Sequence, residues 1–150
     1  MALTPRRLKK LVTYRERLEK LQERELALTA QRQAERQRAL DAAIDARGQS
    51  LGEAVATGPL DPLVLTSAIS YLGRMDREIE ARHAALAHSS DETEAERAKL
   101  LGRRRDRKAM EALLERAREQ IRRDGQRGAM AAIDEQAGSR WLRNNNRPPA

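Results

Sequence analysis

The stretch "TGPLDP", Thr57–Pro62, decides the fold, because it contains signals that end one helix and start another. Gly58 can adopt the left-handed conformation that terminates a helix, and Pro59 cannot continue one. Asp61 is a good N-cap, and Pro62 falls at the first helical position, where its missing N–H costs little. The stretch therefore predicts a reversal between two helices.

Upstream of this turn, the sequence predicts one long helix from about residue 4 to 56. Thr4 is a plausible N-cap followed by Pro5, and no further proline occurs before Pro59. The apolar residues form two stripes in different phases, which predicts a stutter and loose packing near the middle of the helix. The first stripe is Leu11, Tyr14, Leu18, Leu21 and Leu28, and the shifted one is Leu26, Gln33, Leu40 and Arg47 with Ala30, Gln37, Ile44 and Leu51.

Downstream of the turn, a seven-residue repeat predicts a second and longer helix. Seven of nine positions in this repeat are Leu or Ile, and the companion positions are apolar at both ends but polar in the middle. The repeat is Leu65, Leu72, Ile79, Leu86, Thr93, Leu100, Arg107, Leu114 and Ile121, with companions Ala68, Met75, Arg82, Ser89, Glu96, Arg103, Met110 and Ala117.

The second helix is expected to be continuous over about residues 62 to 138. Ser89 and Glu92 could form a capping box that starts a new helix, but the repeat continues through Thr93 without a change of phase. Gly125 and Gly128 should weaken the helix. We expect it to end near Gly138, with a polar, disordered tail over residues 141–150.

These elements predict an all-α protein in which residues 1–140 form one antiparallel coiled-coil hairpin, with the turn at 57–61 and the second helix longer. Each helix can cover its apolar stripe only on a neighbour, and a short turn makes neighbours antiparallel. Counting outward from the turn, the first helix runs out before the second. We therefore expect Leu114, Ile121, Met130 and Ile133 to lack a partner within the chain.

Composition argues against an enzyme. The 150 residues are 35% charged, include no Phe, and have a mean hydropathy of -0.81, so little apolar material is left for a compact core. His83 and His88 are five residues apart and point in different directions on a helix, and no phosphate-binding loop is present. We expect no catalytic residues, no cofactor and no metal.

The chain is also expected to be cytoplasmic and not inserted in a membrane. It has no cysteine, no apolar run near the ~18 residues that span a bilayer, and no apolar core of a secretory signal at its N-terminus.

The formal net charge of +7 raises the alternative of a nucleic-acid-associated coiled coil. Residues 97–123 hold eleven Lys and Arg against four acids, but neither interleaved aromatic residues nor an uninterrupted leucine zipper accompanies them. An acidic protein surface is the favoured partner, and a purely structural scaffold is a further alternative.

The C-terminal run "RRRDRKAMEALLERAREQIRRDGQRGAMAAIDEQAGSRW" resembles the end of the flagellar type III export protein FliJ family, and "LTSAISYLGRMDREIEARHAAL" resembles the segment that opens its second helix. The residues that carry the C-terminal resemblance are Arg107, Met110, Leu114, Ile133, Asp134, Glu135 and Ala137, with Ile133 where Leu or Met is usual.

The resemblance implies a non-catalytic stalk that inserts into the hexameric ring of the export ATPase, contacts the large export-gate membrane protein and escorts empty export chaperones at the cytoplasmic face of the inner membrane. Equivalent stalk proteins of virulence injectisomes have the same outline and remain an alternative. The resemblance places the gate contact at Tyr71, Met75, Glu78 and Arg82, although Met75 could instead pack against the first helix. We expect the ATPase contact at Arg104, Arg107, Leu114, Arg118, Ile121, Arg122, Met130, Ile133, Asp134 and Glu135.

Overall fold

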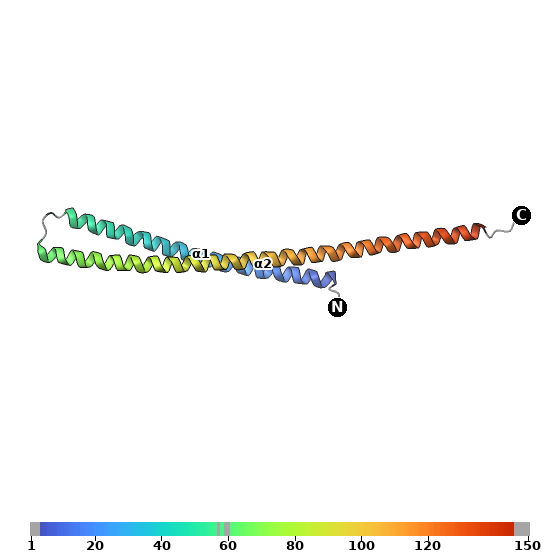
Figure 1. Cartoon of the computed structure of the whole chain (residues 1–150), viewed down its shortest axis with the longest axis horizontal. Coiled ribbons are helices and arrows are strands. Elements are labelled where there is room, and N and C mark those ends of the chain that lie inside the picture. The colour runs from blue at the N-terminus through green and yellow to red at the C-terminus, as the bar shows by residue number, and fades with distance from the viewer. Residues whose placement is uncertain (1–3, 57, 59–60, 146–150) are drawn as a thin grey trace. The chain divides into compact units, whose positions relative to one another are not determined.

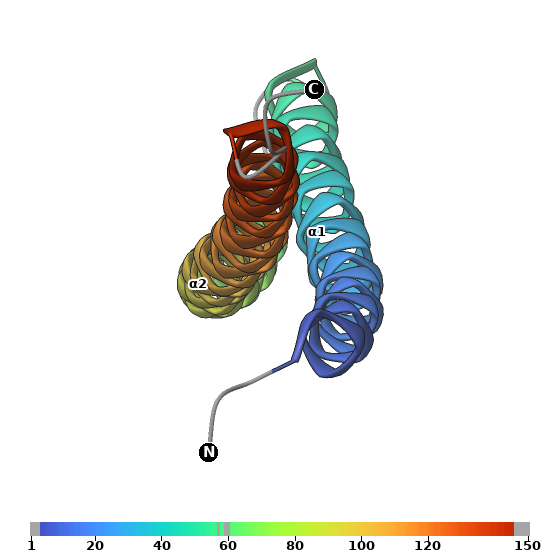
Figure 2. The same cartoon turned by 90° about the vertical axis from the view of Figure 1, so that its right-hand side faces the viewer.

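The computed structural model describes residues 4–56, 58 and 61–145, and these residues form two α-helices. Helix α1 spans Pro5–Ala56 and helix α2 spans Pro62–Asn145. Figures 1 and 2 show only helical elements in the described part of the chain. The prediction of an all-α hairpin with a longer second helix is confirmed.

The helix ends have the predicted caps. The Thr4 carbonyl accepts hydrogen bonds from the Arg7 and Leu8 amides, at 2.9 and 3.0 Å. Gly58 has a φ of 76°, which is the left-handed conformation expected at a helix end. The Asp61 carboxylate accepts a hydrogen bond from the Leu63 amide at 2.9 Å. Thr57, Pro59 and Leu60, the other residues of the predicted turn, lie outside the described residues.

Helix α2 is continuous, as the unbroken repeat predicts. It passes Ser89 and Glu92 without a second start, and it also passes Gly125 and Gly128. Instead of ending near Gly138, it continues to Asn145, since single glycines weaken a helix by only about 1 kcal/mol each and no proline interrupts this stretch. Residues 146–150 of the predicted tail lie outside the described residues.

The chain divides into two units, which we describe separately. The turn unit, Leu18–Arg104, contains the C-terminal part of α1 and the N-terminal part of α2, which run in opposite directions. The terminal unit combines Met1–Arg17 with Arg105–Ala150.

The seam of α2, meaning the line of residues that faces α1, is the predicted one. Every position of the seven-residue repeat from Leu72 to Leu114 is buried or half-buried, and so is every companion position from Ala68 to Ala117. Leu65 and Ile121, at the two ends of the repeat, are exposed. The leucine and isoleucine spacing of this helix was therefore sufficient to find its packed face.

The seam of α1 differs from the prediction. It is one uninterrupted series with alternating steps of three and four residues, so the predicted stutter is wrong. Leu11, Tyr14, Leu21 and Leu28, which were expected to be packed, are exposed, whereas Leu18 is half-buried. The shifted stripe is confirmed in part: Leu26, Gln33, Leu40 and Arg47 are buried or half-buried, but Ala30, Gln37, Ile44 and Leu51 are exposed. The seam includes Leu8, Val12, Arg15, Glu19, Gln22, Leu26, Thr29, Gln33, Arg36, Leu40, Ala43 and Arg47.

Polar contacts between the helices explain why α1 packs this less apolar face. In the turn unit, the Gln22 amide donates to the Glu96 carboxylate, and the Arg47 guanidinium pairs with Asp76. In the terminal unit, Arg15 pairs with Asp106 at 3.0 Å. Each polar seam residue named here therefore has a partner on the opposite helix.

Backbone carbonyls also accept hydrogen bonds from arginines of the polar seam. The Arg36 guanidinium donates to the Ala85 carbonyl at 3.0 Å, and the Arg82 guanidinium donates to the Ala39 carbonyl at 3.1 Å. The buried Thr93 hydroxyl donates to the Ser89 carbonyl at 2.9 Å. Hydrogen bonding thus lets the middle of the hairpin bury side chains that could not pack as an apolar core.

The Arg47–Asp76 pair should make the hairpin sensitive to acid. The hydrogen bond from Arg47 holds the pKa of Asp76 below its ordinary value; desolvation opposes this shift and charge attraction adds to it. A carboxylate with a lowered native pKa contributes its full stability above its unfolded-state pKa of about 3.9, and loses it as pH falls through the native pKa. As the pH is lowered from 7 to below about 4, the melting temperature of the wild-type chain should fall more steeply than that of Asp76→Asn.

Thermal melts followed by circular dichroism across this pH range check the prediction. Asp91→Asn is the matched control, because Asp91 is an exposed carboxylate on the same helix. Its melts should follow the wild type at every pH. If the melting temperatures of the wild type and Asp76→Asn fall in parallel as the pH is lowered, the Arg47–Asp76 pair does not couple folding to protonation.

Candidate protein-interaction surfaces

The described residues contain neither a metal cluster nor a membrane-spanning helix. Within 4–56, 58 and 61–145, no three His, Asp or Glu side chains are grouped so as to hold a metal ion. In the same ranges, no helix has a long enough apolar stretch to cross a bilayer. His83 and His88 are both exposed.

Three of the four predicted gate-contact residues line one hollow in the turn unit. Met75, Glu78 and Arg82 of α2 face an alanine series of α1 across a space of about 280 Å³. The small alanine side chains leave this space open beside the seam. We call it the alanine groove, and its α1 residues are Ala39, Ala42, Ala43 and Ala46.

Arg82 fixes one wall of the alanine groove. Its Nε donates to Glu78 Oε1 at 3.1 Å, and its Nη1 donates to the Ala39 carbonyl at 3.1 Å. Met75 is half-buried at a seam position. Met75 and Arg82 therefore serve the hairpin as well as the groove, while Glu78 remains exposed.

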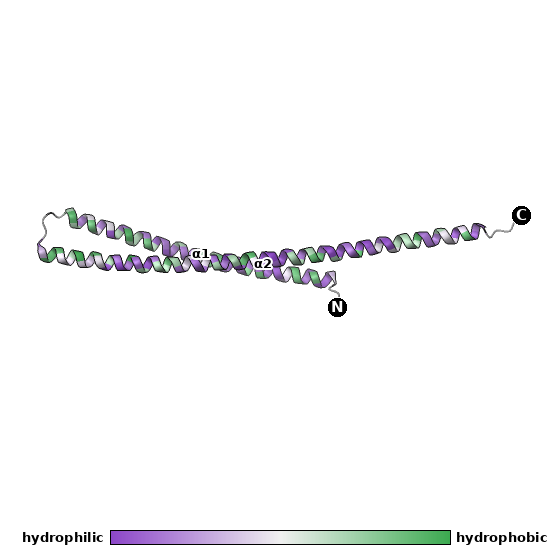
Figure 3. Cartoon of the chain, in the orientation of Figure 1, coloured by the Kyte–Doolittle hydropathy of each residue, from purple (hydrophilic) through white to green (hydrophobic). Residues whose placement is uncertain are grey.

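Tyr71 is the most accessible apolar side chain of the predicted gate contact. It is 46% exposed and does not line the alanine groove. The Arg74 guanidinium carbon lies 5.7 Å from the centre of the Tyr71 ring, a cation–π distance. Figure 3 shows that the apolar residues of α2 are concentrated at its turn end, where this tyrosine lies.

Leu114 does not belong to an uncovered end. It is 7% exposed and packs in a hydrophobic cluster of the terminal unit with Leu8 and Val12 of α1. Met110 and Ala117 pack against the same cluster. The prediction that Leu114 lacks an internal partner is wrong, because Leu8 and Val12 of α1 pack against it.

The predicted ATPase-contact arginines form ion pairs within their own unit. In the turn unit, Arg104 pairs with Glu23 at 3.0 Å and Glu19 at 3.2 Å, and hydrogen bonds to these two carboxylates raise the pKa of Arg104. The others pair with acids of α2 in the terminal unit: Arg107 with Glu111 at 2.6 Å, Arg118 with Glu115 at 3.6 Å, and Arg122 with Glu119. The pairs between exposed side chains, such as Arg118 with Glu115, contribute little to stability, about 0–1 kcal/mol each, so they can exchange partners.

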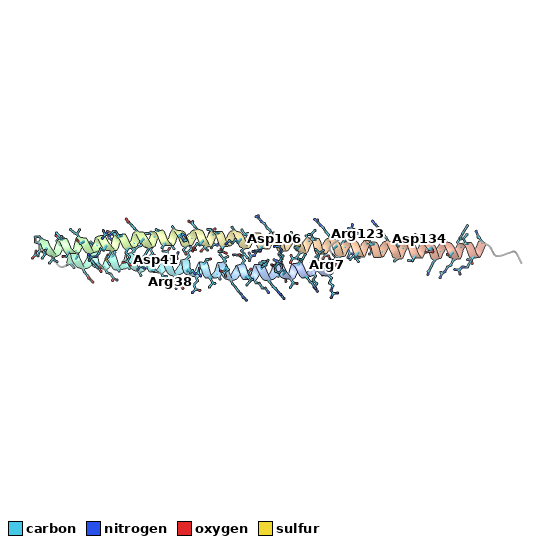
Figure 4. All side chains as sticks on the ribbon, turned by 90° about the horizontal axis from the view of Figure 1, so that it is seen from below. Arg7, Arg38, Asp41, Asp106, Arg123 and Asp134 are labelled. Atoms are coloured by element: carbon cyan, nitrogen blue, oxygen red, sulfur yellow. The ribbon has the colours of Figure 1, made fainter. Side chains whose placement is uncertain are left out.

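Beyond this covered part, α2 has a terminal stretch, residues 121–145, in which every residue is exposed. Ile121, Met130 and Ile133 lie here, as do the predicted contact residues Asp134 and Glu135. Figure 4 shows Arg123 and Asp134 on this stretch, and both line a shallow hollow beside Met130. The terminal stretch thus combines exposed apolar residues with charges of both signs.

Most of the chain matches a family model. The model for the "Flagellar FliJ protein" family matches residues 4–146. The chain belongs to the FliJ family. No curated protein and no solved structure matches it. FliJ membership makes this chain a component associated with flagellar protein export.

Two features of this FliJ-family chain were missed in the sequence. Trp141 and Leu142 were assigned to the tail, but they are exposed residues of α2. The absence of any proline between Pro62 and Pro148 could have indicated that the helix continues. The alanine groove was also missed, although the spacing of Ala39, Ala42 and Ala46 on one side of a helix was visible.

Proposed function

We propose that this FliJ-family chain is the non-catalytic stalk that couples the flagellar export ATPase ring to the membrane export gate. One observation carries the proposal most directly. The terminal stretch of α2 exposes apolar side chains at Ile121, Met130, Ile133 and Trp141 on an unbroken helix. A helix that keeps such residues in water is suited to burying them in another protein.

The ATPase contact is placed on the terminal stretch and on the charged residues just before it. Arg118 and Arg122 flank the start of the stretch, and Asp134 and Glu135 lie beside Ile133. Charges of this kind speed encounter with a partner of complementary charge, while apolar side chains hold the bound state. Leu114 supports this contact indirectly, because it anchors α2 in the hydrophobic cluster.

The gate contact is placed at Tyr71 and the alanine groove. Tyr71 offers an exposed aromatic ring, and the groove offers a hollow lined by alanines, Met75 and the charged side chains of Glu78 and Arg82. An aromatic anchor with a hollow of small apolar and charged side chains is a composition that suits an interface, since aromatic residues dominate the interface centre and polar groups its rim. The proposal further includes escort of empty export chaperones and a cytoplasmic position at the inner membrane, because the gate is a membrane protein.

A three-component pull-down tests the coupling role. The cytoplasmic part of the export-gate protein is immobilised, and capture of the cognate flagellar export ATPase is measured with and without this chain. The chain should increase ATPase capture by bridging. Tyr71→Ala should reduce capture of the chain itself, since an aromatic residue at the centre of an interface contributes roughly 1–3 kcal/mol.

Tyr14→Ala is the matched control, because Tyr14 is the other tyrosine of the chain and is also exposed. It should leave capture by the gate unchanged. Circular dichroism should show the same melting for both variants. ATPase capture that does not depend on the chain would refute the coupling role, and an early-melting Tyr71→Ala variant would assign Tyr71 to the hairpin instead.

A further inference from the structure

Helix α1 carries a second apolar stripe, of which every residue except the half-buried Leu18 is exposed. It consists of Leu11, Tyr14, Leu18, Leu21 and Leu28. Tyr14 and Leu21 are 56% and 55% exposed, and Leu28 is 47% exposed. We call this the outer stripe, to distinguish it from the seam.

The spacing of the outer stripe is that of a coiled-coil seam. Its steps are three and four residues, and of the six positions from residue 11 to residue 28 only Glu25 is polar. Leu11 and Tyr14 belong to the terminal unit, and Leu18, Leu21 and Leu28 belong to the turn unit; in each unit the spacing puts them on one side of α1. Such spacing matches the knobs of another helix better than it matches a flat surface or an extended peptide.

One flank of the outer stripe carries a basic residue at every second turn. Lys10, Arg17 and Arg24 each precede a stripe position and recur every seven residues. None of the three forms an ion pair or side-chain hydrogen bond with another described residue. Lys10 and Arg17, with Arg6, Lys9, Thr13 and Tyr14, also line a surface hollow of about 510 Å³.

This flank determines which helix fits, because residues beside a coiled-coil seam select the partner by charge. Two copies joined antiparallel through the outer stripe would bring Lys10, Arg17 and Arg24 of one copy against the same residues of the other. Parallel copies would bring them against residues 15, 22 and 29, which are Arg, Gln and Thr. Neither arrangement offers an acid, so a second copy is disfavoured.

We propose that the outer stripe is a docking site for an amphipathic, acidic α-helix of another protein. The partner helix would present leucine-like residues to Leu11, Tyr14, Leu21 and Leu28, and Glu or Asp to the basic flank. This inference does not rest on the coupling role, because it uses residues outside both the terminal stretch and the gate contact.

Two synthetic 21-residue peptides of coiled-coil pattern test the site. Both have leucine at the stripe-facing positions, and the flanking residues are glutamate in one and lysine in the other. Fluorescence anisotropy of the labelled peptides measures binding to the full chain. The glutamate peptide should bind at least about tenfold more tightly than the lysine peptide.

Two variants separate apolar from charged contributions. Leu21→Ser should weaken the glutamate peptide about tenfold. The triple change Lys10→Glu, Arg17→Glu and Arg24→Glu should reverse the preference between the peptides. Leu101→Ser is the matched control, since Leu101 is an exposed leucine of α2 that is 54% accessible, and it should leave binding unchanged.

Several outcomes would overturn the proposal. Equal binding of the two peptides, or unchanged binding by Leu21→Ser with wild-type melting, would remove the site. A scrambled peptide with the same glutamates but without the apolar spacing should bind poorly. If it binds tightly, charge attraction alone explains the binding and the outer stripe is not the docking site. A concentration-dependent dimer in sedimentation that Leu21→Ser abolishes would show that a second copy occupies the stripe.

Discussion

Removal of residues 121–150 should lower the ATPase activity measured with this chain to that of the export ATPase alone. The deletion takes away every exposed apolar side chain of the terminal stretch, including Ile121, Met130, Ile133 and Trp141. It leaves the hydrophobic cluster around Leu114 in place, and it removes Arg122 and Arg123, whose exposed ion pairs with Glu119 contribute little to stability. Melting of the hairpin should therefore stay close to that of the full chain.

The boundary of this deletion matters. A cut at residue 112 would also remove Leu114 and Ala117, so Leu8 and Val12 would lose their covering and binding could fail through unfolding. The full-length variant Ile133→Ser avoids this problem and should lose part of the stimulation. Its matched control is Leu101→Ser, an exposed leucine in the turn unit, which should stimulate as the wild type does.

ATP hydrolysis by the cognate ATPase at a fixed concentration of each variant is the measurement, with circular dichroism melts beside it. Full stimulation by the chain lacking residues 121–150 would place the coupling surface elsewhere. Loss of stimulation together with early melting would instead assign the terminal stretch a role in folding.

Leu40→Ala should destabilise the hairpin by about 2–5 kcal/mol, which corresponds to a melting temperature about 10 °C lower. Leu40 is 2% exposed, and it is one of five buried apolar side chains among the described residues. Its neighbours along the seam of α1 include Gln33, Arg36 and Arg47, so little apolar material can collapse into the cavity. A loss of this size is large beside the roughly 5–15 kcal/mol that stabilises a typical domain.

Leu28→Ala is the matched control, because it makes the same change on the same helix at an exposed position. It should shift the melting temperature by much less. Urea or thermal denaturation followed by circular dichroism measures both. If Leu28→Ala is as damaging as Leu40→Ala, the outer stripe is packed in solution and the seam assigned here to α1 is incorrect.

The sequence predicted some residues of the candidate interaction surfaces, but not the contacts that surround them. The exposed positions of Ile121, Met130 and Ile133 could be predicted, because the apolar repeat of α2 extends past the end of α1. The burial of Leu114 could not, since it depends on how far α1 reaches along α2. The alanine groove is lined by residues of both helices. Its presence depends on the register between the helices, which the sequence of one helix does not determine.

The sequence by itself determined the two helices, the turn and the packed face of α2. Gly58 and Asp61 act through their own backbone and side-chain geometry, and the Leu and Ile repeat of α2 defines a single apolar line. For α1 the sequence offered two stripes, and only the tertiary structure decided that the face with Leu26, Gln33, Leu40 and Arg47 packs along the helix. The apolar count alone favours the outer stripe, yet α1 presents the seam with Arg15, Gln22 and Arg47, because Asp106, Glu96 and Asp76 of α2 supply the partners that these polar residues need on burial.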